Sequence, residues 1–272
     1  MRRLLLLALL ALVGTCKTNP HTGRSQLLLF SESEMNQLGQ QAYLEMTGPQ
    51  SGTSVVANSR YVGPLQEVGG AISVAANRPD YQWEFKLIDD PKMINAWALP
   101  GGKIAFYTGI YPVLEDQAGM AVVMGHEVMH AILQHGNERM SQSLTAELVL
   151  AAAAIGLHDS ENRDVILGAL GAGAAIGVLL PYSRKHESEA DEQGLYLAAR
   201  AGYDPEAGIG VWERMAALSE GSRPPEFLST HPDPKRRIEN MRKWMPKAKQ
   251  YYNEAPRKMP NWKLPLPPGV SR

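Results

Sequence analysis

Residues 117–139 read QAGMAVVMGHEVMHAILQHGNER, and the interpretation of the whole chain starts from this stretch. Its apolar residues recur at helical spacing, which predicts a buried helix from Glu115 to about Ser143. The helix carries the pattern HExxH, in which His126 and His130 are four residues apart. Side chains at that spacing leave a helix on one face about one turn apart, so both imidazoles can reach one zinc ion.

Glu127 lies between the two histidines and is the expected general base. Zinc lowers the pKa of a bound water to about 7, and a neighbouring glutamate can accept the proton of that water as it attacks a carbonyl. The alternative is two unrelated histidines on a buried helix. Because HExxH is rare by chance and lies here on a predicted helix, as the motif requires, the metal site is the favoured interpretation.

Two histidines do not complete a zinc site, so a third ligand must come from elsewhere. The longer metzincin pattern needs glycine at 133 and histidine at 136, where this chain has Leu133 and Gly136. His135 is one residue short of that position and would point away from the metal face. Deformylase-type sites, which add a cysteine ligand to HExxH, are excluded because the only cysteine is Cys16. A carboxylate from a second helix remains.

A helix expected over Ser183–Ala201 offers this carboxylate. Glu187 and Asp191 are i and i+4 on it, which suits a metal ligand and a second carboxylate that holds an imidazole through its other nitrogen. Ala190 would let the two metal-site helices approach closely, and Glu189 points to another face. The spacing favours Glu187 among the candidate ligands, which are Glu138, Glu147, Glu161, Glu187 and Glu189.

The rest of the chain predicts an α+β fold of helices around a small antiparallel sheet. A helix capped by Ser31 or Ser33 should run to about Met46, and a second helix should follow it. Alternating apolar residues and the turn at Pro100-Gly101-Gly102 predict three strands. The expected bounds are Arg60–Ala76 for the second helix, and Gln82–Ile88, Met93–Leu99 and Lys103–Thr108 for the strands.

Two apolar, alanine- and glycine-rich segments lie between the metal-site helices, at Leu144–Leu157 and Val165–Leu180. Each is shorter than the ~20 residues that span a bilayer. We therefore expect a buried helical hairpin, with an element that touches a membrane as the alternative.

Residues 1–16 predict an export signal. The basic start Met1-Arg2-Arg3 precedes the apolar run Leu4–Val13, which is too short to span a bilayer comfortably. Cys16 follows this run, at the place where a bacterial lipoprotein signal has its lipid-acceptor cysteine. We expect lipidation of Cys16, with simple cleavage or retention as an anchor as alternatives. The net charge of -1 gives no reason to expect a nucleic-acid partner.

Several motifs together resemble one family. HEVMH followed by ESEAD, the segment NAWALPGGKIAFYTG at 95–109 and the segment STHPDPKRRI at 229–238 are similar to elements of the gluzincin zinc metallopeptidases. That family contains the CAAX prenyl endopeptidase, HtpX and the Oma proteases, and the chain most resembles small exported bacterial members such as BepA and LoiP. The resemblance spans residues 19–241 and implies a mainly helical minigluzincin-type domain with an HExxH active-site helix.

The resemblance also implies roles for individual residues. One Zn²⁺ per chain would be held by His126, His130 and Glu187, with Glu127 as general base. Asp191 would support the ligands from behind. His231 would stabilise the oxyanion or cap the zinc in a resting state. Asn95 would contact the backbone of a substrate, and Arg237 is a weaker candidate that a structural salt bridge would explain equally well.

The expected organisation is a signal at 1–16, a zinc metallopeptidase domain at 17–250 and a proline-rich tail at 251–272, which would wrap the domain or stay mobile. The expected function, implied by the resemblance, is a periplasmic zinc endopeptidase, lipid-anchored to the outer membrane, that degrades unfolded or misassembled envelope proteins. The alternative is a chaperone-like substrate-binding protein whose protease site is kept latent by His231.

Overall fold

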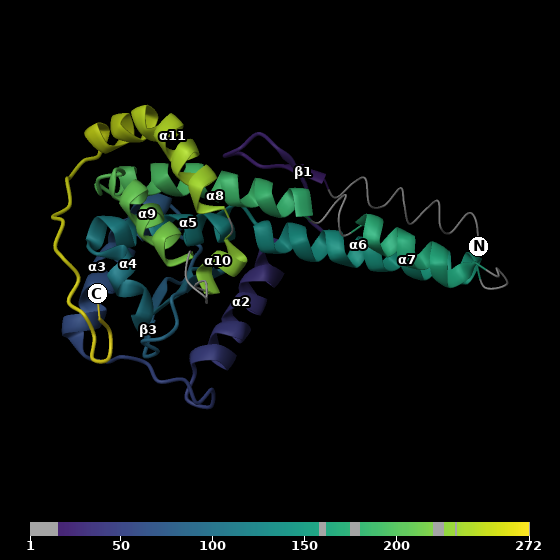
Figure 1. Cartoon of the computed structure of the whole chain (residues 1–272), viewed down its shortest axis with the longest axis horizontal. Coiled ribbons are helices and arrows are strands. Elements are labelled where there is room, and N and C mark those ends of the chain that lie inside the picture. Colours follow the sequence, from purple (N-terminus) through teal and green to yellow (C-terminus); the bar gives the residue numbers. More distant parts are fainter. Residues whose placement is uncertain (1–15, 158–161, 175–179, 220–225, 232, 272) are drawn as a thin grey trace. The chain divides into compact units, whose positions relative to one another are not determined.

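The computed structural model describes residues 16–157, 162–174, 180–219, 226–231 and 233–271 (Figure 1). The predicted signal up to residue 15 and the candidate ligand Glu161 lie outside the described residues. The chain divides into two compact units. The smaller unit consists of Met1–Met35 and Leu133–Glu187, and the larger unit of Asn36–Ile132 and Ser188–Arg272.

The larger unit contains a three-stranded sheet in the order β3-β5-β4. β4 and β5 form an antiparallel hairpin, and its turn is possible because Gly101 and Gly102 both have a φ of 85°. β3 runs parallel to β5, so this sheet is mixed. The predicted α+β class is confirmed, with a parallel pair that the pattern of single strands did not indicate. The bounds are Glu84–Ile88 for β3, Ala96–Leu99 for β4 and Lys103–Tyr107 for β5.

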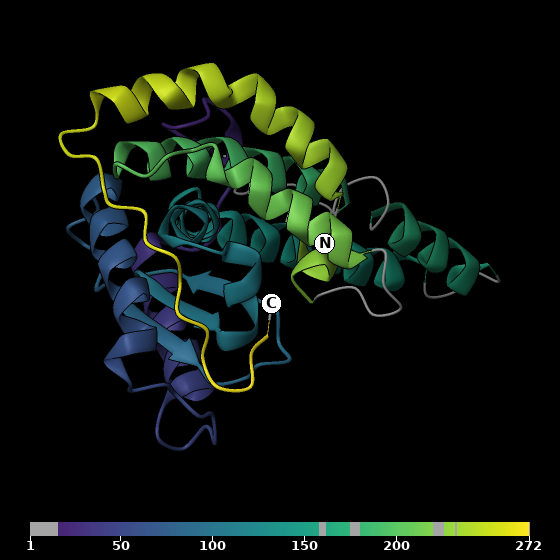
Figure 2. The same cartoon turned by 60° about the vertical axis from the view of Figure 1, so that its left-hand side comes forward.

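Helix α5 lies at the centre of the larger unit, with α3, α9 and the sheet packed around it (Figure 2). All of its side chains except His130 are buried, which accounts for the apolar sequence of this helix. The other helices pack on this core. Their bounds are Ser59–Ala76 for α3, Tyr111–Leu114 for α4, Gln117–Ile132 for α5, Ala207–Ser219 for α9, Glu226–Thr230 for α10 and Pro234–Glu254 for α11, with a short 3-10 turn η1 at Thr108–Ile110.

The single helix predicted from Glu115 to Ser143 is wrong, because the structure has two helices there. α5 ends at Ile132 and α6 (His135–Gly156) begins three residues later. Between them Gln134 adopts a left-handed conformation with φ of 55°. A left-handed residue cannot continue a right-handed helix, so the chain leaves the helical path there.

Two further helices each contribute residues to both units. α2 (Glu32–Thr47) begins with the predicted cap at Ser31, whose Oγ accepts a hydrogen bond from the Glu34 backbone N–H at 3.2 Å. The Glu34 carboxylate in turn accepts one from the Ser31 N–H at 2.7 Å, which is a capping box. α8 (Leu180–Arg200) matches the helix predicted over Ser183–Ala201 closely.

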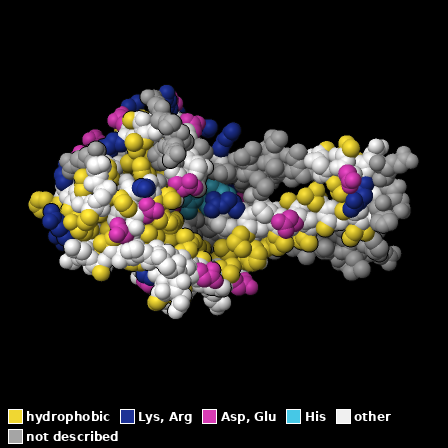
Figure 3. Space-filling model, turned by 60° about the horizontal axis from the view of Figure 1, so that its bottom comes forward, with side chains coloured by type: hydrophobic (Ala, Val, Ile, Leu, Met, Phe, Trp, Pro, Cys, Tyr) yellow, Lys and Arg dark blue, Asp and Glu magenta, His cyan; other side chains and the backbone are white. Residues whose placement is uncertain are grey.

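The smaller unit contains a two-stranded antiparallel sheet and the helical hairpin of α6 and α7. The prediction that this hairpin is buried is wrong for its described side chains, since Ile155 is 64% and Val165 74% exposed. Hydrophobic side chains of this hairpin reach the surface in Figure 3. Among the described helices, none has both the length and the apolar character needed to cross a membrane. The bounds are Cys16–Thr18 for β1, Ser25–Leu27 for β2 and Arg163–Ala174 for α7.

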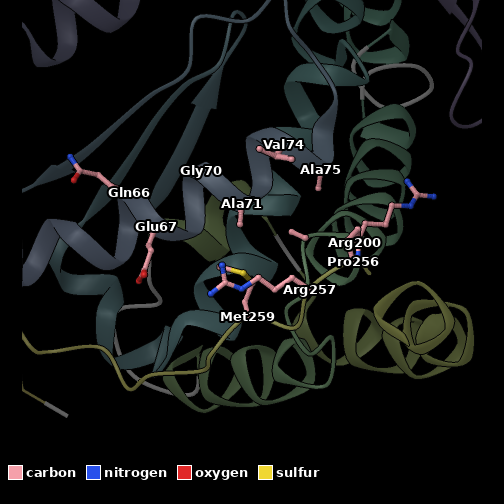
Figure 4. A pocket seen from close by; sticks show the side chains of 11 residues that line it. Gln66, Glu67, Gly70, Ala71, Val74, Ala75, Arg200, Pro256, Arg257 and Met259 are labelled. Carbon is pink, nitrogen blue, oxygen red and sulfur yellow. The ribbon is translucent and has the colours of Figure 1, made fainter. Parts of the chain in front are cut away.

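The chain after α11, which ends at Glu254, takes an extended course along the larger unit. Its backbone makes hydrogen bonds to this unit: Met259 N–H donates to Gly202, Leu264 N–H donates to Glu115, and Trp262 accepts from Gln117. A pocket of about 610 Å³ opens between the tail, α3 and the end of α8 (Figure 4). None of the predicted site residues lines this pocket.

Candidate active site

The two histidines of HEVMH face each other on α5. Their Nε2 atoms are 3.1 Å apart, and the ring of His126 meets that of His130 edge-on. Two nitrogens bound to one zinc at about 2.1 Å in tetrahedral geometry would be about 3.4 Å apart. The observed distance is close to this value, so the pair fits a single zinc ion.

His231, directly after α10, lies beside this pair in the larger unit. Its ring stacks on Phe227 with centroids 4.3 Å apart, and its Nδ1 is 3.1 Å from the carbonyl oxygen of Phe227. Because a carbonyl oxygen only accepts, Nδ1 carries a proton in this contact. Its Nε2 is 3.5 Å from Oε1 of Glu127, so the expected base and this histidine adjoin each other.

Four side chains together could hold a metal ion: His126, His130, Glu187 and His231 offer ligand atoms that all lie within 4.8 Å of one another. Imidazole nitrogens and carboxylate oxygens are the usual ligands of catalytic zinc. Such sites have three protein ligands and one position for water or substrate. The group therefore offers one donor more than a catalytic zinc needs.

Asp191 and Arg237 lie behind His126. Oδ1 of Asp191 is 3.0 Å from Nδ1 of His126, and the guanidinium of Arg237 donates to both carboxylate oxygens, with Nε 2.7 Å from Oδ2. Arg237 also lies 3.6 Å above the ring of Trp212. The carboxylate can only accept, so its contact favours a proton on Nδ1 of His126 and a lone pair on the Nε2 that faces His130. Nη2 of Arg237, which can only donate, also lies 3.0 Å from Nδ1 and 3.3 Å from Nε2 of His126, so Asp191 and Arg237 make opposite demands on Nδ1. Burial raises the pKa of Asp191, and the positive charge of Arg237 opposes that rise.

Replacing Asp191 by asparagine is expected to weaken zinc binding about 10–100-fold, because an amide can present its N–H₂ group to His126 and favour the wrong tautomer. Competition with a chelating dye measures this affinity. Glu189→Gln, two residues away on α8, is the matched control and should bind zinc as the wild type does. Equal affinities for Asp191→Asn and the wild type would contradict this role.

Two glycines bring α5 and α8 together next to the histidines. A Cβ on Gly194 would lie 2.6 Å from the backbone nitrogen of His126, and a Cβ on Gly125 would lie 2.5 Å from the carbonyl oxygen of Gly194. The sequence suggested Ala190 as the point of close approach between the two helices, and Ala190 is fully buried. The contact that leaves no room for a Cβ lies one turn further along the helix, at Gly194. A glycine on each helix was the signal that could have located this crossing.

Other predicted site residues lie outside the group of four. The amide oxygen of Asn95, the residue directly before β4, accepts a hydrogen bond from the Ala96 N–H at 2.9 Å. Cys16 is exposed and opens β1. Of the other carboxylates considered as ligands, Glu138 is bound by Arg24 in the smaller unit, and Glu147 is exposed on α6.

Comparison with known proteins gives a family and several relatives. The model of Peptidase family M48 matches residues 61–245. The mitochondrial metalloendopeptidase OMA1 of Saccharomyces cerevisiae is 38% identical over 186 residues, 64% of this chain and 50% of that protein. The mitochondrial metalloendopeptidase OMA1 of Danio rerio is 33% identical over 246 residues, 85% and 50% of the two chains. The beta-barrel assembly-enhancing protease of Escherichia coli is 26% identical over 238 residues, which cover 85% of this chain and 48% of that protein.

The chain spans about half the length of these relatives. The part that matches the family model begins within α3, ends within α11 and includes all four candidate ligands. The resemblance to the metallopeptidases that include the Oma proteases is thereby confirmed. The chain belongs to peptidase family M48.

Proposed function

We propose that this chain is a zinc-dependent endopeptidase that hydrolyses peptide bonds in unfolded or misassembled proteins. The observation that carries the proposal is the pair of Nε2 atoms of His126 and His130, 3.1 Å apart on the helix that also presents Glu127. Membership of a peptidase family and relatives named as metalloendopeptidases support the same chemistry.

In this proposal, His126, His130 and Glu187 hold one Zn²⁺ per chain. Bound zinc supplies Lewis-acid chemistry, which acidifies a water and polarises the carbonyl of a peptide bond. Glu127 accepts the proton of the attacking water and passes it to the leaving amine. Asp191 keeps the proton of His126 on Nδ1, so that its Nε2 can bind metal.

His231 has two roles consistent with its place beside Glu127. Its Nδ1 is engaged by the carbonyl of Phe227, so only Nε2 can act at the site. From there it would either donate a hydrogen bond to the carbonyl oxygen as negative charge develops, which needs a ring protonated on both nitrogens, or cap the zinc in a resting state through the Nε2 lone pair of the neutral ring.

The substrate would bind as an added strand. Among the described strands, β4 pairs with β5 alone and so forms an edge of its sheet. An extended peptide can add to such an edge by backbone hydrogen bonds. Asn95 directly precedes β4, and because its amide oxygen is engaged by Ala96, its Nδ2 would donate to a carbonyl of the substrate backbone.

The proposed location is the bacterial periplasm, with a lipid anchor on Cys16 in the outer membrane and envelope protein quality control as the task. The apolar run Leu4–Val13 and the exposed Cys16 support export and anchoring. The Escherichia coli relative is named for β-barrel assembly, which supports the task, while the OMA1 relatives are named as mitochondrial.

The test is zinc content and cleavage of unfolded casein by the wild type, His126→Ala and His231→Ala. The wild type should hold one zinc per chain and cleave casein, and His126→Ala should lose both because one ligand is gone. A wild type without zinc, or full cleavage by His126→Ala, would overturn the proposal.

The same experiment assigns His231. If His231 caps the zinc, the alanine variant should cleave casein faster at equal zinc content. If it stabilises the oxyanion, kcat should fall about 10²–10³-fold at equal zinc content. Binding of casein by the wild type without any cleavage would favour the chaperone-like alternative.

A further inference from the structure

A second cluster of buried polar side chains lies in the smaller unit, apart from the chemistry proposed above. Its centre is Glu138 on α6, of which 1% is exposed. Arg24 binds this carboxylate with both terminal nitrogens: Nη1 donates to Oε1 at 2.5 Å, and Nη2 donates to Oε2 at 2.7 Å. Nε2 of Gln26 donates to Oε2 at 2.7 Å and to the carbonyl oxygen of Leu133 at 2.8 Å.

His186 on α8 completes the cluster. Its Nε2 is 3.0 Å from Oε2 of Glu138, and because the carboxylate can only accept, this nitrogen is the donor. The ring also stacks on His135, with centroids 4.2 Å apart and planes inclined by 14°. Both histidines are fully buried.

The carboxylate of Glu138 stays ionised over a wide pH range. Burial alone would raise its pKa, but hydrogen bonds from His186, Arg24 and Gln26 lower it to about 2. This buried carboxylate accepts from Arg24, Gln26, His186 and, at 3.5 Å, Gln142. Such a group is a rigid junction, because loss of a charged donor would leave part of the buried charge uncompensated.

This junction joins three segments that are far apart in the sequence: residues 24–26 at β2, residues 135–138 at the start of α6, and His186 on α8. Glu187 is the next residue after His186 on the same helix. Neighbouring helical residues differ by a rise of about 1.5 Å and a turn of about 100°. Fixing the position and rotation of α8 at His186 therefore fixes the point from which the Glu187 carboxylate extends.

We propose that Arg24, Glu138 and His186 are positioning residues for the metal site, which hold the turn of α8 that presents Glu187. The inference rests on the proposed function, since it needs Glu187 as a zinc ligand. If the inference holds, the segment around β2 helps to position a zinc ligand. That segment lies more than a hundred residues from Glu138 in the sequence. The opposing view is that the cluster only stabilises the fold of its unit.

Two substitutions separate these views. Arg24→Met keeps much of the side-chain length and removes both hydrogen bonds to Glu138. His186→Phe keeps a flat ring against His135 and removes the donor to Glu138. Arg78→Met is the matched control, because it breaks a bidentate pair with Asp80, whose side chain is 49% exposed, and this pair belongs to the other unit.

Three measurements are made on full-length protein: zinc affinity by competition with a chelating dye, the d–d absorption spectrum after Co²⁺ substitution, and kcat and KM on unfolded casein. We expect zinc affinity to fall about tenfold or more in both variants, the cobalt spectrum to change, and kcat to fall with little change in KM. Arg24→Lys, which keeps a cation next to Glu138, should bind zinc with an affinity between those of Arg24→Met and the wild type and give an intermediate spectrum.

Unchanged zinc affinity and cobalt spectrum in Arg24→Met and His186→Phe, with only a lower unfolding temperature, would overturn the inference and leave the proposed function standing. A change of equal size in Arg78→Met would overturn it too. A wild type that binds no zinc would overturn the proposed function itself, so the two failures are distinct.

Discussion

Glu127→Gln is expected to lose almost all peptide hydrolysis and to keep its zinc. Glutamine has nearly the same shape as glutamate but cannot accept a proton, so the attacking water loses its base while the ligands are untouched. General-base catalysis contributes about 10²–10⁴-fold, and kcat on unfolded casein should fall within that range. Metal content by atomic absorption should stay at the wild-type value.

The control for this change is Glu147→Gln. Glu147 was a candidate ligand by sequence, but it is exposed on α6, so its amide should leave both kcat and zinc content unaltered. If Glu127→Gln lost zinc in proportion to activity, its carboxylate would be a ligand and another base would have to be found.

Gly194→Ala should destabilise the protein, which is the opposite of what an alanine does in most helices. Alanine normally improves on glycine in a helix by about 1 kcal/mol. Here the added Cβ would lie 2.6 Å from the backbone nitrogen of His126, and neither helix backbone can yield without movement of the whole helix. Overpacking of this kind costs about 1–3 kcal/mol, and moving α8 would also draw Asp191 away from His126.

Urea unfolding and the zinc competition assay together measure this effect. Gly70→Ala on α3 is the matched control, because a Cβ there meets nothing within 4 Å and should stabilise the helix by about 0.5–1 kcal/mol. Stabilisation by both alanines would mean that α5 and α8 are not in tight contact at Gly194.

The parts of the fold and of the site that the sequence predicts are those that depend on one segment at a time. His126 and His130 share a face because of helical spacing alone, and the Ser31–Glu34 capping box needs only residues three apart. Trp83, just before β3, alternates with Phe85 and Leu87 within it, and Pro100-Gly101-Gly102 makes the turn of the β4–β5 hairpin. In each case, the spacing of residues within one segment is enough to predict the local geometry.

Features that depend on the pairing of distant segments were not predictable in this way. Nothing in the alternation of β3 says that it will run parallel to β5. Arg237 was a weak candidate because its partner, Asp191, is 46 residues away, and only the folded chain brings them together. The helix break at Gln134 has no signal in the sequence, because glutamine is a good helix former. The left-handed conformation of Gln134 must be imposed by its surroundings.

The hairpin of α6 and α7 shows a limit of a different kind. Its composition is that of a protein core, and burial was the natural expectation. An apolar composition indicates that a segment can be removed from water. It does not indicate whether the same chain, a lipid or another chain contacts its apolar side chains. The pairing of the two helices was foreseeable from their lengths, whereas the exposure of Ile155 and Val165 was not.

The proline-rich tail has a consequence for anyone who trims the protein for crystallisation or fusion. A helix leaves the N–H groups of its first turn without partners inside the helix, and α5 is the helix that carries HEVMH. Two of these groups are satisfied by the tail: Gln117 N–H donates to the carbonyl of Trp262, and Ala118 N–H donates to the side chain of Asn261 at 2.9 Å. A segment whose proline content suggested only a wrapped or mobile tail thus supplies the hydrogen-bond acceptors for one end of the helix that carries HEVMH.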